Sequence, residues 1–451
     1  MHPQQRVLDP AHRPPRPSAG LGPGMSGRHT LIAGGHVLSM DPAIGELPCA
    51  DVLVEDDVIR SVGPDAGDAD ADDRIDARGR LVLPGFVDTH RHMWQAVLRG
   101  CGADQTLGEH FETVLGALGP RLTPDDLYVG NALSALAALD AGVTTVQDIS
   151  NVGKPTPEHT DALLDALESS GVRCVFAYGM GPAQDARRVR ETRLGTDDAL
   201  VTMAINADGG GDGDGRRIWS LARDLAVPAA PHVRGGRPVS RLHRLGVLRP
   251  GTVFIHGTGL EEGELRLMRD SGAALSIAPA IEMTMGHGLP PFGAAAAAGL
   301  RPGLSTDVEV AAAADLFGPM RTGFQVARLA ALQGLTEGPD GQAALPTTRD
   351  LLEYATIAGA EVLGLGRRTG SLTPGKQADV VVLRADRPGV APVYDAVGTV
   401  VSAMGPGDVE TVLVAGRVVK RDGRLLHPGL PRLLERAAAV RDRLREPAPR
   451  R

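Results

Sequence analysis

The sequence predicts an α/β fold, a (β/α)8 TIM-type barrel with a small β-sandwich domain built from both ends of the chain. Between residues 84 and 366, an amphipathic helix, a small residue and a buried strand alternate, which is typical of βα units. Residues 28–83 and 367–426 instead contain short β-type runs separated by turn residues. The 451 residues can hold one barrel of about 250 residues together with a smaller domain.

The helix and strand signals recur in order along the barrel region. Thr123 and Pro124 open one predicted helix and Gly142 ends it, directly before a buried strand. Counted in this way, the chain contains the eight strands that such a barrel requires. They are expected at residues 82–90, 143–149, 172–179, 199–205, 226–232, 252–256, 273–279 and 301–307.

Both ends of the chain lie outside the two predicted domains. Residues 1–27 are rich in proline and arginine, and we expect a disordered extension. Residues 427–451 carry apolar residues at helical spacing, which predicts a C-terminal helix or tail. This helix would dock on the protein, mediate a homo-oligomer, or lie free in solvent.

Composition excludes several classes of partner. The 47 basic and 55 acidic residues give a net charge of −8, which argues against nucleic acid or an anionic membrane as the main partner. No apolar run approaches the roughly 18 residues of a membrane helix, and the first residues do not resemble a signal peptide. Cys49, Cys101 and Cys174 are too widely spaced for a disulfide framework or a CxxC metal site. We therefore expect a cytoplasmic protein that acts on a small molecule.

Reactive residues stand at the ends of the predicted strands, where a barrel of this type places its chemistry. His90 and His92 are two apart on a strand, so both side chains point to the same face. His232, His256 and Asp307 end the fifth, sixth and eighth strands. Imidazoles with one carboxylate can bind Zn²⁺ or Fe²⁺ and leave a position open for an activated water. This pattern predicts a hydrolase.

These motifs carry a family resemblance. PGFVDTHRH, the histidines of the fifth and sixth strands, STD on the eighth strand and the closing GSLTPGKQADVVVL resemble the amidohydrolase superfamily. The HxHxxQ form of residues 90–95 is similar to the branch of cytosine deaminase, guanine-type deaminases and triazine hydrolases. The resemblance extends from about residue 28 to residue 426.

The resemblance implies one divalent metal ion, Zn²⁺ in the first place and Fe²⁺ as the alternative. Asp307 would also take a proton from the metal-activated water, and His256 would orient that water or polarise the substrate. Binuclear members bridge two metals with a carboxylated lysine on the fourth strand, but residues 199–205 contain no lysine. We therefore expect a mononuclear site. The implied metal ligands are His90, His92, His232 and Asp307.

One departure from the branch concerns the proton donor. There the histidine of the fifth strand opens an HxxE motif, whereas here Gly235 stands in place of the glutamate after His232. Breaking a C–N bond near neutral pH requires a proton donor within reach of the leaving group. Glu282, in the segment of the seventh strand, is the candidate replacement. The alternative is that Glu282 only anchors its loop.

Four further residues are candidate substrate contacts. Trp94 and Gln95 follow the metal pair, where stacking and amide recognition of a flat heterocycle are expected, although Trp94 also fits a hydrophobic core. Arg234 can bind an anionic group through its guanidinium fork, or lie on the surface. His287 is expected to contact the substrate.

A glycine-rich run and two polar residues near the second strand are expected to have structural rather than catalytic roles. The glycine-rich run at 208–215 matches neither a P-loop nor an EF-hand, so we expect a flexible loop. Asp148 and Asn151 are expected to form hydrogen bonds at the end of the second strand.

Together the motifs predict a metal-dependent aminohydrolase that replaces the exocyclic amino group of a nitrogen heterocycle by hydroxyl. One alternative is hydrolysis of a cyclic amide or of a chloro-substituted heterocycle, because those reactions make different demands on the proton donor. A second alternative is a non-catalytic scaffold protein. Five converging metal-type residues count against the scaffold, since an idle site has no physical need for them.

Overall fold

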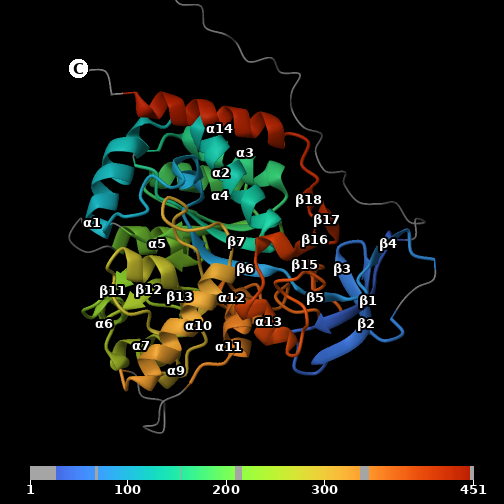
Figure 1. Cartoon of the computed structure of the whole chain (residues 1–451). Coiled ribbons are helices and arrows are strands. Elements are labelled where there is room, and N and C mark those ends of the chain that lie inside the picture. Colours follow the sequence, from blue (N-terminus) through green and yellow to red (C-terminus); the bar gives the residue numbers. More distant parts are fainter. Residues whose placement is uncertain (1–26, 67–69, 154, 209–215, 336–344, 447–451) are drawn as a thin grey trace, which may run out of the picture.

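The computed structural model describes residues 27–66, 70–153, 155–208, 216–335 and 345–446 (Figure 1). The expected disordered extension therefore lies outside the described residues, except for residue 27. Of the glycine-rich loop, only Asp208 is described.

Two parallel sheets form the centre of the large lobe. The first has the order β10-β9-β8-β7-β6 and the second the order β11-β12-β13-β14. Both are rich in buried residues, as expected for parallel strands covered by helices. The strands are β6 (Phe86–Arg91), β7 (Val143–Ser150), β8 (Arg173–Tyr178), β9 (Val201–Asn206), β10 (Ala229–Ala230), β11 (His232–Arg234), β12 (Val253–Thr258), β13 (Ala274–Ile277) and β14 (Gly303–Leu304).

Isolated parallel bridges connect the two sheets at both of their edges. Ala229 pairs with Thr252 at one edge, and Arg91 pairs with Asp307 at the other. At the second edge, the backbone N–H of His92 donates to Asp307 O at 2.9 Å, and that of Asp307 donates to His90 O at 3.0 Å. The arrangement is a TIM-barrel-type α/β fold.

Two of the predicted strands are interrupted. The expected first strand divides at Gly85, where a Cβ atom would lie 2.1 Å from Thr144 Oγ1, into β5 (Arg80–Pro84) and β6. Only β6 joins the five-stranded parallel sheet, whereas β5 belongs to the nine-stranded sheet described below. The expected fifth strand divides at Pro231 into β10 and β11, because proline has no N–H to donate to a neighbouring strand.

Helices surround the parallel strands (Figure 1). Helix α2 (Pro124–Asp140) begins where the sequence predicts, with Thr123 and Asp126 forming a capping box, and it ends just before Gly142. The other helices of the lobe are η2 (Met93–Leu98), α1 (Leu107–His110), η3 (Phe111–Leu118), η4 (Gly119–Arg121), α3 (Pro157–Ser170), α4 (Ala183–Thr192), α5 (Arg216–Asp224), α6 (Pro238–Arg244), α7 (Glu262–Asp270), α8 (Pro279–Thr284), α9 (Phe292–Ala297), α10 (Phe317–Leu332), α11 (Thr348–Tyr354) and α12 (Ile357–Val362).

The two chain ends build one nine-stranded sheet beside this lobe. Its order is β18-β17-β16-β15-β5-β1-β2-β3, with β4 paired to β1. The antiparallel pair of β5 and β15 joins the N-terminal and C-terminal strands. These strands belong to one continuous sheet, so the two-layered sandwich stays a prediction. Their bounds are β1 (His29–Leu38), β2 (Glu46–Glu55), β3 (Val58–Gly63), β4 (Asp73–Asp76), β15 (Val380–Arg384), β16 (Val409–Val414), β17 (Arg417–Arg421) and β18 (Arg424–Leu425), with α13 (Ala396–Ser402) and η5 (Pro406–Asp408) between β15 and β16.

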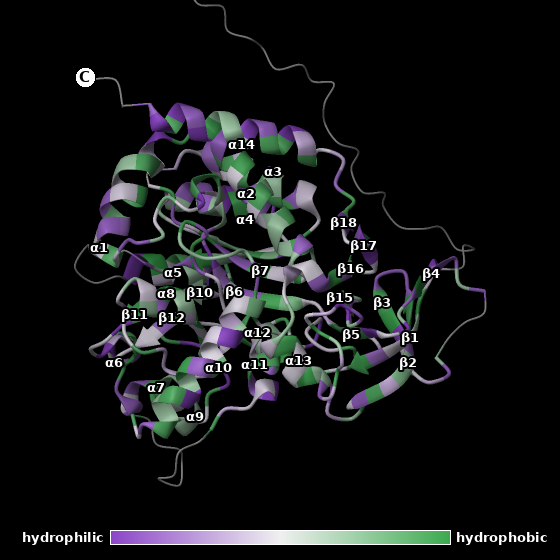
Figure 2. Ribbon diagram, in the orientation of Figure 1, coloured by the Kyte–Doolittle hydropathy of each residue, from purple (hydrophilic) through white to green (hydrophobic). Residues whose placement is uncertain are grey.

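The predicted C-terminal helix forms as α14 (Leu430–Arg445) and packs on α2 of the same chain. It buries Leu433, Val440 and Leu444, and Figure 2 shows hydrophobic and hydrophilic residues along its length. The Arg436 guanidinium lies 5.1 Å from the centre of the Tyr128 ring. Crossing a membrane needs a long apolar helix, and none of the helices in the described part of the chain meets that requirement.

Candidate active site

A pocket of about 440 Å³ opens among the loops that follow the parallel strands. Part of its wall is apolar and includes Leu107, Phe111, Leu115, Met180 and Met285. Phe111 and Met180 are about half exposed, so the apolar wall continues to the pocket mouth. The polar side is formed mainly by His92, Asp208, His232, His256, His287 and Asp307.

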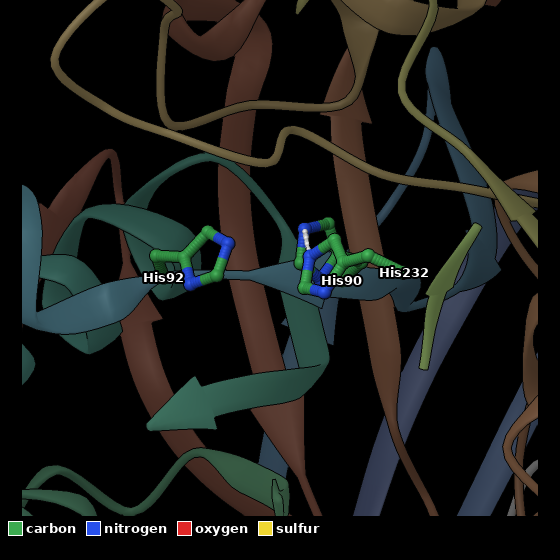
Figure 3. Close-up of side chains that lie close together, drawn as sticks. All are labelled: His90, His92 and His232. Atoms are coloured by element: carbon green, nitrogen blue, oxygen red, sulfur yellow. Dashed lines mark hydrogen bonds between the residues drawn. The ribbon is translucent and has the colours of Figure 1, made fainter. Parts of the chain in front are cut away.

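Three histidines and one aspartate converge at this pocket. His90 Nε2 lies 3.3 Å from His232 Nε2 and 3.1 Å from Asp307 Oδ1. His92 Nε2 lies 3.6 Å from the same carboxylate oxygen. Figure 3 shows the three imidazoles gathered where β6 ends and β11 begins. The structure therefore brings together all four residues that the resemblance implies as metal ligands.

The protonation states of His90, His92 and Asp307 fit a divalent cation, whereas, despite burial, Asp208 raises the pKa of His232, so this ring would release a proton when it binds a metal. Burial lowers the pKa of His90 and places that of His92 well below its usual value, so both rings are held neutral. Although burial opposes ionisation of Asp307, the neighbouring His90 keeps the pKa of this carboxyl well below its usual range. Neutral imidazoles and an ionised carboxylate are the forms that bind metal. The Nε2 atoms of His90 and His232 lie 3.3 Å apart, so one cation could coordinate both.

Asp208 orients one member of the cluster. Its Oδ2 lies 2.5 Å from His232 Nδ1, and its Oδ1 accepts the backbone N–H of His232 at 2.7 Å. An Nδ1–H that donates to this carboxylate leaves the Nε2 lone pair of His232 facing His90. The sequence interpretation missed Asp208 because it stands within a glycine-rich run. Its place just after β9, at a strand end, is the signal that identifies it.

His256 lies between two carboxyl groups. Its Nε2 is 3.7 Å from Asp307 Oδ2, and its Nδ1 is 3.2 Å from Glu282 Oε1. Both His256 and Asp307 have positive φ angles, of 73° and 66°. Such backbone conformations are costly for residues other than glycine and concentrate at functional sites.

Glu282 lies behind His256 and does not line the pocket. Its side chain is fully buried, Oε1 accepts the Ala278 N–H at 2.8 Å, and Oε2 has no partner among the described residues. Burial raises the pKa of this carboxyl well above its usual value. The backbone carbonyl of Glu282 also accepts the N–H of His287 at 2.8 Å. Glu282 therefore contacts His256 rather than the pocket, and it also forms the loop-anchoring bonds of the alternative interpretation.

His287 and Arg234 line the pocket, and their contact with substrate stays a prediction. The His287 ring packs edge-on against His256 at 4.5 Å, and both of its nitrogens are buried without a partner among the described residues. Burial lowers the pKa of His287 to about 3, so the ring is neutral. Arg234 is exposed, and no acidic group in the described part of the chain lies within ion-pair distance of it.

Trp94 and Gln95 do not reach the pocket. Both lie on η2 and are almost fully buried, with Trp94 donating its indole N–H to Asn151 Oδ1 at 2.9 Å. The backbone of Trp94 lies so close to α2 that a Cβ on Gly130 would be 2.4 Å from Trp94 O. This tight packing turns η2 inward, which corrects the expected substrate contacts and agrees with the core alternative for Trp94.

The sequence interpretation also missed two polar residues of the pocket, His110 and Asn206. Both are buried, and each has one side-chain nitrogen without a partner among the described residues. Asn206 is the last residue of β9, and its position at a strand end could have identified it. His110 lies on the short helix α1, so its position gives no such indication.

The position of the missing glutamate is open space. Gly235 has a φ of 53°, and no atom lies within 4 Å of where its Cβ would be. Among the described residues, Asp208 and Asp307 supply the carboxylates of the pocket wall, and both are already engaged by histidines. No free carboxylate of the described chain therefore faces the pocket.

Comparison with known proteins agrees with this geometry. The model of the amidohydrolase family matches residues 81–211 and 230–419. A 5-methylthioadenosine/S-adenosylhomocysteine deaminase of Symbiobacterium thermophilum is 29% identical over 423 residues, covering 87% of this chain and 93% of that protein. A 5′-deoxyadenosine deaminase of Methanosarcina mazei is 27% identical over 441 residues, covering 92% and 98%.

Solved structures show the same fold. An adenosine deaminase from Xanthomonas campestris with bound zinc has a TM-score of 0.81 at 24% identity, covering 92% of this chain and 98% of that one. An atrazine chlorohydrolase from Arthrobacter aurescens complexed with zinc has a TM-score of 0.80 at 22% identity, covering 91% and 100%.

Proposed function

The chain belongs to the amidohydrolase family, and from this premise we propose that it is a metal-dependent aminohydrolase acting on a nitrogen heterocycle. The observation that carries the proposal is the convergence of His92, His232 and Asp307 in the pocket wall with the buried His90 in contact with them and His256 beside them. Relatives that carry the names of adenine-nucleoside deaminases support the same reaction class. The reaction exchanges an exocyclic amino group for hydroxyl and releases ammonia.

A single zinc ion is the proposed cofactor, with iron as the alternative. Strand β9 contains no lysine that could bridge a second metal. When bound, the cation would lower the pKa of a water towards neutrality and so provide the nucleophile. The residues that would hold it are His90, His92, His232 and Asp307.

Asp307 and His256 are the proposed catalytic residues. Asp307 accepts one proton from the attacking water and returns it to the departing amino group. The water oxygen bonds to the ring carbon, the C–N bond breaks, and the nitrogen leaves as ammonia. Nε2 of His256 would face the reacting oxygen, because Glu282 holds its Nδ1.

The missing glutamate leaves the protonation of the substrate ring to another group. Glu282 is the proposed source, since no free carboxylate of the described chain faces the pocket. Its proton would pass to Nδ1 of His256 while Nε2 gives its own proton to the ring nitrogen. Nε2 would then take the proton of the new hydroxyl as the ring carbonyl forms, which restores Glu282 and His256. Glu282 is thus a positioning and proton-holding residue. The proposed substrate contacts are His287 and Arg234, and the apolar wall would pack against the rest of the heterocycle.

Hydrolysis of a chloro-substituted heterocycle or a cyclic amide is the second candidate. The absence of a side chain at Gly235 favours displacement of chloride in particular, because a departing chloride needs no proton. A scaffold protein without catalysis is disfavoured by the five converging metal-type side chains.

The domain organisation completes the proposal. The two parallel sheets would be the halves of one (β/α)8 barrel over residues 84–366. Residues 28–83 and 367–426 would form a β-sandwich domain, with residues 427–451 as a C-terminal helix or tail. A homo-oligomer and a cytoplasmic location are expectations from the sequence, as is a substrate other than nucleic acid or lipid.

The test compares zinc-loaded wild-type protein with the Asp307→Asn variant on a compound that the wild type turns over. The wild type should release ammonia, and the variant should keep its circular dichroism spectrum but release none. An Asp307→Asn variant with the wild-type rate would contradict the mechanism.

A further inference from the structure

A cluster of buried charges adjoins the proposed metal ligands in the chain and lies outside the pocket lining. Arg91 stands between His90 and His92 and does not line the pocket. Asp88 precedes His90 by two residues. Glu309 follows Asp307 by two residues. The side chains of Asp88, Arg91 and Glu309 are fully buried, and we call these three residues the seam cluster.

The seam cluster is connected by hydrogen bonds across the chain. Arg91 Nε and Nη2 donate to Asp88 Oδ2 at 2.9 and 2.7 Å, and Nη1 reaches Glu309 Oε1 at 3.4 Å. Asp88 also accepts the Thr306 hydroxyl at 2.5 Å and the Thr306 N–H at 3.2 Å. Glu309 additionally accepts Arg99 Nε at 2.7 Å.

These contacts lie where the first and the last strand segments of the large lobe meet. There Arg91 pairs with Asp307 in an isolated bridge, and the backbones of His90 and His92 bond to Asp307. Three of the four proposed ligands therefore stand on the two segments that the seam cluster ties together.

The backbone of Asp307 explains why a tie is needed at this point. Its φ of 66° is a strained conformation, which persists only where the surroundings hold it in place. The seam cluster binds Thr306 on one side of Asp307 and includes Glu309 on the other. Replacing a buried ion pair by well-packed apolar residues is often neutral or stabilising, so the fixed geometry of these charges is the better explanation for their presence.

We propose that the seam cluster fixes the spacing between the histidines of β6 and Asp307, so that Arg91 and Glu309 are positioning residues for metal binding. The inference rests on the proposed function, because it assumes that these ligands hold a cation. The rigid guanidinium fork is essential to this role, and a lysine ammonium cannot reproduce it.

The chain offers a matched control. Arg173 donates through Nε and Nη2 to the two oxygens of Asp379 at 2.7 and 2.9 Å, and both residues are almost fully buried. Arg173 begins β8, at the end of the strand remote from the pocket, and neither residue lines the pocket. This pair has the same chemistry and burial as the seam cluster without its connection to the ligands.

The experiment measures zinc affinity by chelator competition and the absorption spectrum of the cobalt-substituted protein. Arg91→Lys and Glu309→Gln should each weaken zinc binding about 10- to 100-fold and alter the cobalt spectrum. Arg173→Lys should leave both readouts unchanged. Glu309→Gln keeps the side-chain shape, so it tests the inference even if Arg91→Lys does not fold.

Two results would overturn the inference. One is wild-type zinc affinity in both seam-cluster variants, and the other is an equal loss of affinity in Arg173→Lys. Wild-type protein that binds no zinc would instead contradict the proposed function itself, which separates the two failures.

Discussion

Glu282 Oε1 lies 3.2 Å from Nδ1 of His256, while Nε2 of the same ring faces Asp307 at 3.7 Å. The imidazole thus links a buried carboxyl to the centre of the proposed site. Glu282 therefore contacts His256 and not the pocket, although the sequence suggests a direct contact with substrate. The tautomer of His256, and hence the role proposed for its Nε2, depends on Glu282.

The first prediction concerns this link. Glu282→Gln should lower kcat about 10- to 100-fold with little change in KM, because the side chain orients His256 but does not touch the substrate. Steady-state kinetics measure both constants, and circular dichroism checks the fold. A variant with raised KM and wild-type kcat would show that Glu282 contributes to binding instead.

The second prediction concerns Asp208. Asp208→Asn should weaken zinc binding about 10- to 100-fold, because His232 loses the negative charge at Nδ1. Isothermal titration of the metal-free variant with zinc measures the effect. Unchanged affinity would mean that Asp208 only anchors the end of β9.

A pair of arginines gives the third prediction. Arg234→Met should raise KM for the substrate, because Arg234 lines the pocket and has no acidic partner among the described residues. Arg237→Met is the control, since Arg237 is exposed and pairs with Glu261 at 3.1 Å. Equal KM values in the two variants would remove Arg234 from the substrate site.

The fourth prediction concerns stability. Zinc that binds only the folded protein should stabilise it by about 4 kcal/mol at 1,000 times its dissociation constant. Removal of zinc by a chelator should therefore lower the midpoint of thermal unfolding, and added zinc should restore it. A midpoint of thermal unfolding that changes neither with chelator nor with added zinc would contradict a metal site in the folded chain.

Much of the fold follows from local patterns in the sequence. The alternation of helices and buried strands predicts the parallel sheets, and the family match confirms the expected amidohydrolase membership. The breaks at Gly85 and Pro231 were not predicted. At the first, Gly85 lies too close to Thr144 to carry a side chain, and at the second, Pro231 has no N–H to donate.

The site was predictable where residues follow strands directly. His90, His92, His232, His256 and Asp307 all stand at or just after the ends of the predicted strands, and the structure brings them together. The positions of Trp94 and Gln95 depend on the direction in which η2 turns, which only the packing against α2 determines. His110 reaches the pocket from α1 and carries no periodic signal.

The central claim is tested most directly by ammonia release from zinc-loaded protein across aminopyrimidines, aminopurines, pterins and aminotriazines. The account predicts release from at least one compound, with the hydroxylated ring as product, and loss of release after chelation. Protein that holds zinc but releases no ammonia from any of these compounds would contradict an aminohydrolase and favour halide or cyclic-amide hydrolysis.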